Sequence, residues 1–234
     1  GLHHSAARIE LGDLRIKSES ASKFSASFER KSTNWGYSIA PYLNSINDFI
    51  LLEPSSVEFT IRGAFPVWSY RQTDAQLLGI DVALFKNWTD RWRTDHNFSW
   101  VRGHDKSTDT PLINIPAANL NNTLTFTDAN WKNLRVALES QYVFEQKRFP
   151  PNISVFSPEQ QQEVELDINS PPEAYHLLAL DSEIQFSISK TNDLTVGLRI
   201  TNLLNTEYRD YLNRLRYFVD DLGRNISIRI LYNY

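Results

Sequence analysis

Hydrophobic and polar residues alternate with a period of two along much of the chain, and the last eleven residues, 224–234, show this most clearly. One face of an extended strand there would carry the apolar and aromatic side chains Ile226, Ile228, Ile230, Tyr232 and Tyr234. The other face would be polar. A strand of about ten residues with one apolar face and interfacial tyrosines has the dimensions of a transmembrane β-strand. A half-buried edge strand of a soluble β-sandwich gives the same alternation, so the choice depends on whether the pattern recurs.

It does recur: nine segments carry the alternation, and helical spacing fits them worse. The spacers between them are of two kinds. Short polar turns follow Lys31, Trp88, Thr127 and Ser189. Long spacers cover residues 53–67, 103–117, 146–172 and 205–223. A meander with short turns at one end and long loops at the other is typical of an outer-membrane barrel, so we predict an all-β, antiparallel transmembrane β-barrel of which this chain supplies about nine C-terminal strands.

The direction of the strands follows from the same count. If the C-terminus is periplasmic, the final strand descends, the short turns are periplasmic and the long loops are extracellular. An odd number of strands does not close an ordinary bacterial barrel. We therefore expect residues 1–234 to be the C-terminal part of a larger barrel, with an N-terminal portion and early strands absent from this sequence.

The amino-acid composition argues against several kinds of partner and site. A net charge of -4 argues against a nucleic-acid partner, because no basic surplus is available to neutralise phosphates. The absence of cysteine excludes disulfides and thiolate metal sites, and no run of eighteen apolar residues predicts a membrane helix. An aromatic content of 12% would suit the two aromatic girdles of a barrel in a lipid bilayer.

Several motifs resemble the C-terminal part of a TonB-dependent outer-membrane receptor. His3-His4 and the segment from Ile9 to Glu19 are similar to the family's "HH…fEiGnpnLkpE" stretch, and Tyr70-Arg-Gln-Thr-Asp-Ala-Gln-Leu-Leu-Gly79 is similar to its "Q-x-D-A-x-L-x-G" strand. The block 200–218, which begins Ile-Thr-Asn-Leu-Leu-Asn-Thr-Glu-Tyr, resembles the family's "N-L-F/L-N-t-x-Y" motif and last external loop. The terminal strand follows it. The last loop and the His-His stretch also resemble receptors for metals, siderophores or haem in Bacteroidetes-like bacteria.

The resemblance implies a barrel of about 22 strands with a plugged lumen. Such a receptor imports a scarce nutrient on energy passed from the inner membrane by TonB, which would act through the missing plug region. A passive porin, or a structural barrel subunit of an outer-membrane complex, is the alternative. A soluble β-sandwich binding module is the third reading.

Candidate ligand-binding residues gather in the predicted loops and at the outer rim. Imidazoles of the histidines ligate metal ions or haem, whereas guanidinium groups and aromatic rings suit anionic chelates and aromatic siderophores. The candidates for substrate binding are His3, His4, Trp68, Tyr70, Arg71, His104, Tyr208, Arg209, Arg214 and Arg216. No metal ligand set is assigned and no resident cofactor is expected. Sequence signatures of a nucleophile with its base, or of a phosphate loop, do not occur, so we expect no enzyme.

Overall fold

A computed structural model describes residues 2–3, 8–61, 63–157, 160–189 and 192–234. Within these ranges the chain is all-β, with a 13-stranded sheet and a separate two-stranded sheet. No helix long and apolar enough to cross a membrane occurs among the described residues. The strands are β1 (Leu2–His3), β2 (Arg8–Leu11), β3 (Ser20–Ser25), β4 (Phe28–Lys31), β5 (Trp35–Thr60), β6 (Gly63–Asn87), β7 (Trp92–Asp105), β8 (Thr110–Pro111), β9 (Asn119–Asp128), β10 (Leu134–Val143), β11 (Ile153–Ser157), β12 (Gln162–Leu166), β13 (Tyr175–Ser187), β14 (Asp193–Thr201) and β15 (Asn225–Asn233).

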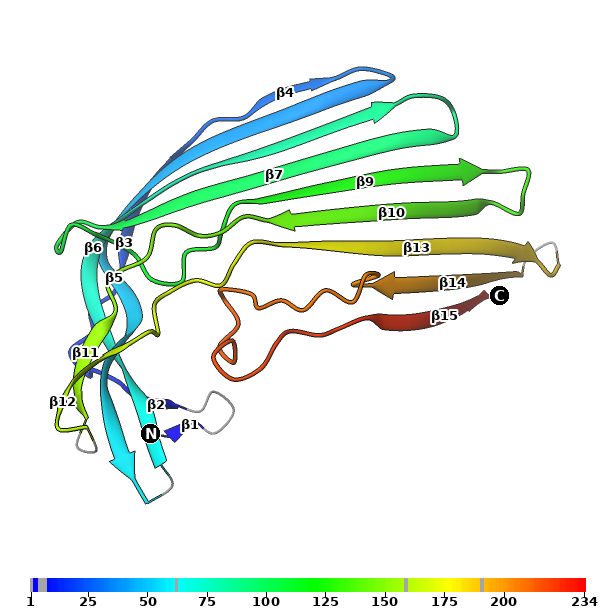
Figure 1. Cartoon of the computed structure of the whole chain (residues 1–234). Coiled ribbons are helices and arrows are strands. Elements are labelled where there is room, and N and C mark those ends of the chain that lie inside the picture. Colours follow the sequence, from blue (N-terminus) through cyan, green and yellow to red (C-terminus); the bar gives the residue numbers. More distant parts are fainter. Residues whose placement is uncertain (1, 4–7, 62, 158–159, 190–191) are drawn as a thin grey trace.

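The large sheet is a curved antiparallel wall that does not close on itself (Figure 1). Its strands follow the chain in the order β3 with β4, β5, β6, β7, β9, β10, β13, β14 and β15. The turns after β4, β6, β9 and β13 lie at one end of the wall together with the C-terminus, and the long connections lie at the other end. The predicted antiparallel barrel architecture is therefore confirmed, and so is the gathering of the short turns at one end of the wall.

The strand predicted before the short turn that follows Lys31 is divided into β3 and β4. Ala26 and Ser27 separate the two pieces, and the amide of Ala26 still donates to the carbonyl of Pro41 over 3.2 Å. Pro41 has no amide hydrogen to return that bond, so the ladder is interrupted opposite it.

The long loop predicted over residues 53–67 is wrong, because this stretch is strand. β5 and β6 continue pairing from Glu53 with Ser69 out to Thr60 with Gly63, and form an overhang that turns away from the wall (Figure 1). The ladder accommodates two prolines: Pro54 lies at a register shift, and Pro66 pairs with Val57. We call residues 53–67 the overhang. β2 adds to the overhang side of β6 as a parallel strand, through Ile9 with Val67.

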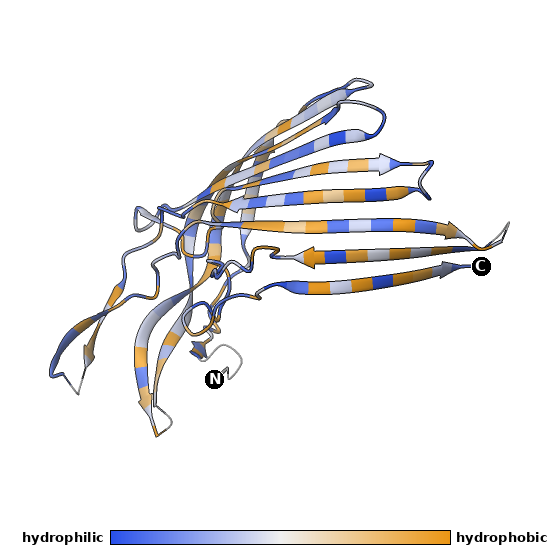
Figure 2. Cartoon of the chain, turned by 45° about the vertical axis from the view of Figure 1, so that its right-hand side comes forward, coloured by the Kyte–Doolittle hydropathy of each residue, from blue (hydrophilic) through white to orange (hydrophobic). Residues whose placement is uncertain are grey.

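The two faces of the wall differ in polarity as the alternation predicts (Figure 2). On one face Leu138 pairs with Leu124 on one side and with Leu180 on the other, and this apolar row continues to β15. On the other face Arg199 forms ion pairs with Glu139 at 2.7 Å and with Asp181 at 3.4 Å. The apolar face is the one that suits lipid, and the ion-paired face suits the barrel lumen.

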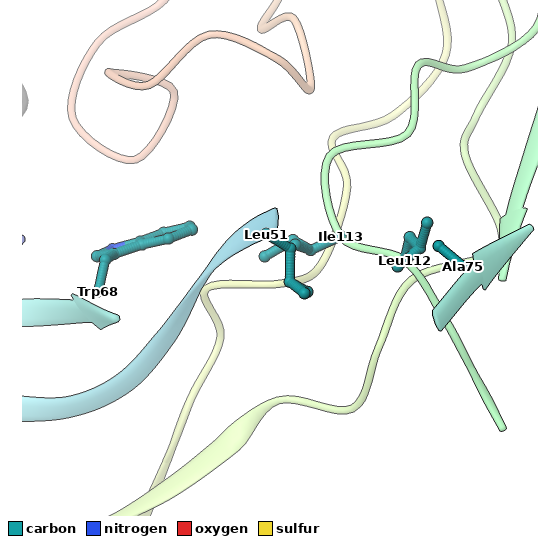
Figure 3. Close-up of a cluster of buried hydrophobic side chains, with 5 residues drawn as sticks. All are labelled: Leu51, Trp68, Ala75, Leu112 and Ile113. Atoms are coloured by element: carbon teal, nitrogen blue, oxygen red, sulfur yellow. The ribbon is translucent and has the colours of Figure 1, made fainter. Parts of the chain in front are cut away.

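A buried apolar cluster lies where the base of the overhang meets the connection between β7 and β9. It consists of Leu51, Trp68, Ala75, Leu112 and Ile113 (Figure 3). Gly103 permits this packing, because a β-carbon there would lie 2.6 Å from Ile115 Cδ1. The cluster fixes the connection against β5 and β6, and so fixes one side of the cavity described below.

Candidate ligand-binding site

A cavity of about 350 Å³ lies at the loop end of the wall, within the size range of small-molecule sites. Four parts of the chain line it: β2, the neighbouring stretches of β5 and β6, the connection between β7 and β9, and the loop 205–223, which we call the last loop. The lining residues are Arg8, Phe49, Ile50, Leu51, Leu52, Trp68, Ile113, Asn114, Ile115, Leu212, Arg214, Arg216 and Tyr217. Three of these are arginines, and none of these described lining residues is acidic.

Arg8 is held against the indole of Trp68. The parallel pairing of β2 with β6 brings Arg8 to this position, and its guanidinium carbon lies 4.7 Å from the centre of the indole. Both residues are buried. Arg8 Nε donates to Glu10 Oε1 over 2.8 Å, so a carboxylate just outside the cavity balances its charge. Arg8 therefore supplies a fixed cation that stacks on an aromatic face.

Arg216 is buried in the last loop between two tyrosine rings. Its guanidinium carbon lies 4.5 Å from the ring centres of both Tyr211 and Tyr217. Nη1 donates to the Tyr211 carbonyl and Nη2 donates to the Ile168 carbonyl over 3.1 Å, while Nε is buried without a partner. Within the described residues no carboxylate forms an ion pair with it. Burial lowers the pKa of Arg216, but a guanidinium stays charged at neutral pH.

Arg214 and Tyr217 complete the cavity from the same loop. Arg214 is exposed, and among the described residues it has neither a hydrogen-bond nor an ion-pair partner. Tyr217 donates its hydroxyl to the Ile168 carbonyl over 2.8 Å, and burial raises its pKa to about 12. The cavity thus combines a free cation, two buried cations and aromatic rings. This combination can bind an anion that carries a flat, polarisable surface.

Two asparagines hold the base of the last loop. Asn202 Nδ2 donates to the Thr206 carbonyl and Asn202 Oδ1 accepts from the Thr206 amide, each over 2.8 Å. Asn205 Oδ1 accepts from the Arg224 amide over 2.8 Å, which ties the start of the loop to its end. Both asparagines have positive φ, at 47° and 55°, a conformation that asparagine tolerates well. The Asn-Leu-Leu-Asn-Thr motif is therefore the physical closure of the loop.

Tyr208 and Arg209 were predicted to bind ligand, but neither lines the cavity. Tyr208 packs on Tyr175, with ring centres 4.6 Å apart, and Tyr175 donates to Asp210 over 2.8 Å. Arg209 Nε donates to Asp220 over 2.6 Å. Tyr208 and Arg209 therefore make contacts that hold the last loop in place. Their contact with ligand stays a prediction.

Tyr70 and Arg71 also lie outside the cavity lining, unlike their neighbour Trp68. Arg71 forms ion pairs with Glu53 and, at 2.7 Å, with the buried Asp105. Asp105 accepts further from Thr73 over 2.5 Å and from the backbone that follows it. Arg71 thus links the overhang to the end of β7, and a role in ligand binding stays a prediction for it and for Tyr70.

Neither His3 nor His104 lines the cavity. His3 belongs to β1 and pairs with Arg8 in the strand ladder, whereas His4 lies outside the described residues. His104 Nε2 lies 3.0 Å from Asp109 Oδ1, and its buried Nδ1 has no partner. No group of three His, Asp or Glu side chains in the described ranges is arranged to hold a metal ion.

The cavity residues that the sequence alone did not reveal include Arg8, Asn114 and several apolar residues: Ile113, Ile115, Leu212 and the stretch from Phe49 to Leu52. One signal was available for Arg8. It alternates with Ile9, so a strand there places Arg8 and Glu10 on the same face. Its partner Trp68 is sixty residues distant in the chain, and no local pattern reports such pairing.

Known proteins share both the sequence pattern and the fold. The sequence profile of the family described as "TonB dependent receptor-like, beta-barrel" matches residues 3–203. No curated protein matches the chain. Among solved structures, the copper transporter OprC is 16% identical with a TM-score of 0.71, covering 94% of this chain and 32% of its own.

Two iron-related structures are also similar. The FrpB iron transporter from Neisseria meningitidis is 14% identical, with a TM-score of 0.62 and coverage of 97% of this chain and 32% of its own. The siderophore receptor PirA from Acinetobacter baumannii is 15% identical, with a TM-score of 0.64 and coverage of 96% and 33%. This chain therefore spans about a third of the length of these proteins, and at such identities the likeness concerns the fold. With most of its length matched by the family profile, the chain belongs to the TonB-dependent receptor β-barrel family, whose members are outer-membrane proteins.

Proposed function

We propose that this chain forms the C-terminal wall and loops of an outer-membrane receptor that takes up a scarce nutrient, and that the cavity contributes to ligand capture. The observation that carries the proposal is Arg216, a buried cation on the cavity lining whose Nε–H has no partner and which forms no ion pair with a described carboxylate; Asp210 acts on it only from a longer distance. A buried charge of this kind is costly unless a counter-charge arrives. An anionic ligand supplies that counter-charge.

The lining favours an anionic chelate with aromatic groups as the ligand. Arg8 and Arg216 already stack on rings, and the exposed Arg214 adds a cation that a ligand can reach without displacing a protein partner. A bare metal ion fits less well, because arginine does not ligate metals and the described residues hold no three-ligand group. Solved relatives bear on the same point: PirA is described as a siderophore receptor and FrpB as an iron transporter.

The remaining parts of this function belong to the whole receptor. We propose that the long loops are extracellular, that the short turns and the C-terminus are periplasmic, and that the apolar face contacts lipid. An N-terminal plug and further strands would complete the barrel, and TonB would act through that plug. Support comes from the family match and from the open sheet, whose inner face carries ion-paired polar residues.

The test is ligand binding by the receptor purified in detergent from its own outer membrane. The probes are radioactive iron(III) complexes of 2,3-dihydroxybenzoate and of citrate, with Cu²⁺ as a non-anionic probe. Arg214→Gln removes an exposed cation that has no described partner, and we expect it to weaken binding of the aromatic iron complex about fivefold, roughly 1 kcal/mol, without altering the fold. Arg148→Gln is the matched control, because Arg148 is exposed and lies outside the cavity lining.

The binding measurements distinguish an anionic chelate from a bare metal ion, and they test whether the cavity takes part in ligand capture. Equal binding by both variants and the unmodified receptor would remove the cavity from ligand capture. Tight binding of Cu²⁺ with no binding of either iron complex would contradict the anionic-chelate proposal.

A further inference from the structure

A row of polar side chains crosses the mostly apolar outward face of the wall. His96 on β7 lies opposite Asn122 on β9, and Asn122 lies opposite Ser140 on β10. His176 on β13 reaches the same row and lies 2.8 Å from Ser140 Oγ through its Nε2. We call His96, Asn122, Ser140 and His176 the polar stripe. Four neighbouring strands supply one residue each.

The pairing register shows that the polar stripe is on the lipid side. Thr94, two residues before His96, pairs with Leu124, and Leu124 pairs with Leu138 in the apolar row. On the other side of β7, His96 pairs with the exposed Leu84. Side chains two residues apart on a strand share a face, so the polar stripe lies on the outward face. Its neighbours there include the apolar Leu84, Phe98 and Leu124, and the polar Thr94, whose hydroxyl accepts from Trp88 Nε1.

Its depth also places it within the hydrocarbon. Trp92 and Trp100 are exposed on the same face of β7, four residues before and four residues after His96. Tryptophans of membrane proteins gather at the two interfaces. At ~3.3 Å per residue and a tilt of ~40°, the two tryptophans are roughly 20 Å apart along the membrane normal, close to the height of the apolar band. His96 is midway between them.

Hydrogen bonds within the stripe leave part of it unsatisfied. His96 Nδ1 donates to Asn122 Oδ1 over 2.7 Å, which makes His96 Nε2 an acceptor and leaves both hydrogens of Asn122 Nδ2 to donate. In the described part of the chain, no other group bonds to these two atoms. Unsatisfied polar groups in hydrocarbon are costly, and acyl chains offer no hydrogen bonds.

We propose that a second copy of this chain covers the polar stripe, in a dimer whose two-fold axis runs along the membrane normal between β7 and β9. Such an axis places His96 of one copy across from Asn122 of the other, so that each Nε2 acceptor meets an Nδ2 donor. Both copies keep the same orientation in the membrane, as outer-membrane insertion requires. The surrounding Leu84, Leu124 and Phe98 pack around the four polar atoms and exclude lipid from them.

Disulfide crosslinking in the native outer membrane tests this contact. The chain has no cysteine, so a cysteine introduced into it reports one position on this wall. In a full receptor freed of any other cysteines, Leu124→Cys places the thiol beside the polar stripe, and oxidation should yield a covalent dimer of twice the receptor mass. Leu198→Cys is the matched control, because Leu198 faces outward on β14, away from the stripe. We expect at least fivefold more dimer from Leu124→Cys than from Leu198→Cys.

A second variant tests the role of the hydrogen bonds. His96→Leu in the Leu124→Cys background should lower the dimer yield at least threefold, while the heat-modifiable migration of a folded barrel in gels is retained. Equal crosslinking at both cysteine positions would show random collision and overturn the proposal. A crosslink to a different protein, or a co-purified lipid that His96→Leu releases without any dimer, would assign the stripe to another occupant.

Discussion

Asn202 closes the last loop by bonding to Thr206 with both ends of its side-chain amide, each over 2.8 Å. Its Nδ2 also donates to the Leu222 carbonyl over 3.3 Å, so one side chain joins the beginning of the loop to its end. Asn202 is buried and its φ is 47°. The loop that carries Arg214, Arg216 and Tyr217 therefore depends on a residue that does not line the cavity.

We expect Asn202→Ala to free the last loop from the wall. The substitution removes the hydrogen bonds and places a β-carbon without a compensating polar group at positive φ, which together cost about 2–3 kcal/mol. Tryptic cleavage in the loop should become roughly 30-fold faster. Asn202→Gly relieves the backbone strain without restoring the hydrogen bonds. Its cleavage rate should therefore lie between the rates of the wild type and of Asn202→Ala. Identical rates for all three proteins would contradict the assigned role.

Arg216→Gln should loosen a second connection, 146–172, as well as the last loop. The Arg216 guanidinium bonds to the carbonyls of Tyr211 and Ile168, and Ile168 belongs to that connection. Loss of these bonds costs about 1–3 kcal/mol locally. Hydrogen exchange should therefore quicken around Ile168. Arg214→Gln is the control, since it should reduce binding yet leave exchange at Ile168 unchanged.

Alkaline pH should destabilise the last loop through Tyr217. A tyrosine in an unfolded chain has a pKa of about 10, whereas burial raises the pKa of Tyr217 to about 12. Between these values the folded loop retains a proton that the unfolded chain has lost, so stability falls as pH rises from about 10 to about 12. Tyr217→Phe removes this contribution. A difference titration of tyrosinate absorbance, wild type minus Tyr217→Phe, should show a midpoint near 12, and a midpoint near 10 would contradict the burial.

Gly79→Ala should lower barrel stability by about 1–3 kcal/mol. The ring of Tyr42 lies over Gly79, and a β-carbon at that position would overlap Cζ and the hydroxyl oxygen of Tyr42. Gly12→Ala is the matched control, since nothing lies within 4 Å of a β-carbon there. The temperature at which each folded barrel converts to the slow-migrating form in gels measures the difference. Gly79→Ala with an unchanged temperature would mean that Tyr42 relaxes freely into the lumen.

The strands of the wall could be predicted from the sequence because lipid on one side and a polar lumen on the other impose a period of two on every strand. Leu124, Leu138 and Leu180 follow this rule and meet in one row. The overhang could not be predicted in the same way, because Pro54 and Pro66 resemble loop residues when their partners are unknown. In the structure Pro54 lies at a register shift and Pro66 opposite Val57.

Some residues of the candidate site could be predicted from their side-chain chemistry alone. Trp68, Arg214 and Arg216 were predicted as aromatic and cationic loop residues, and all three line the cavity. Arg209 and Arg71 have the same chemistry but are engaged by Asp220 and Glu53. Only the tertiary structure separates an arginine that has a carboxylate partner from one that does not, because the partners come from distant parts of the chain or from the far side of a loop.

The overhang gives the receptor a region that is free of the constraints that shape the wall. Its outer pairs, out to Thr60 with Gly63, join β5 and β6 only to each other, and Ile61 at its tip is fully exposed. In the proposed orientation this tip faces the cell's surroundings, where antibodies, phages and toxins encounter a receptor. Substitutions at the tip of the overhang would change the surface that antibodies, phages and toxins contact, and would leave the lipid-facing rows and the cavity unchanged. We therefore expect the outer part of the overhang, beyond the pair of Val57 with Pro66, to tolerate substitutions that leave the lipid-facing rows and the cavity lining unchanged.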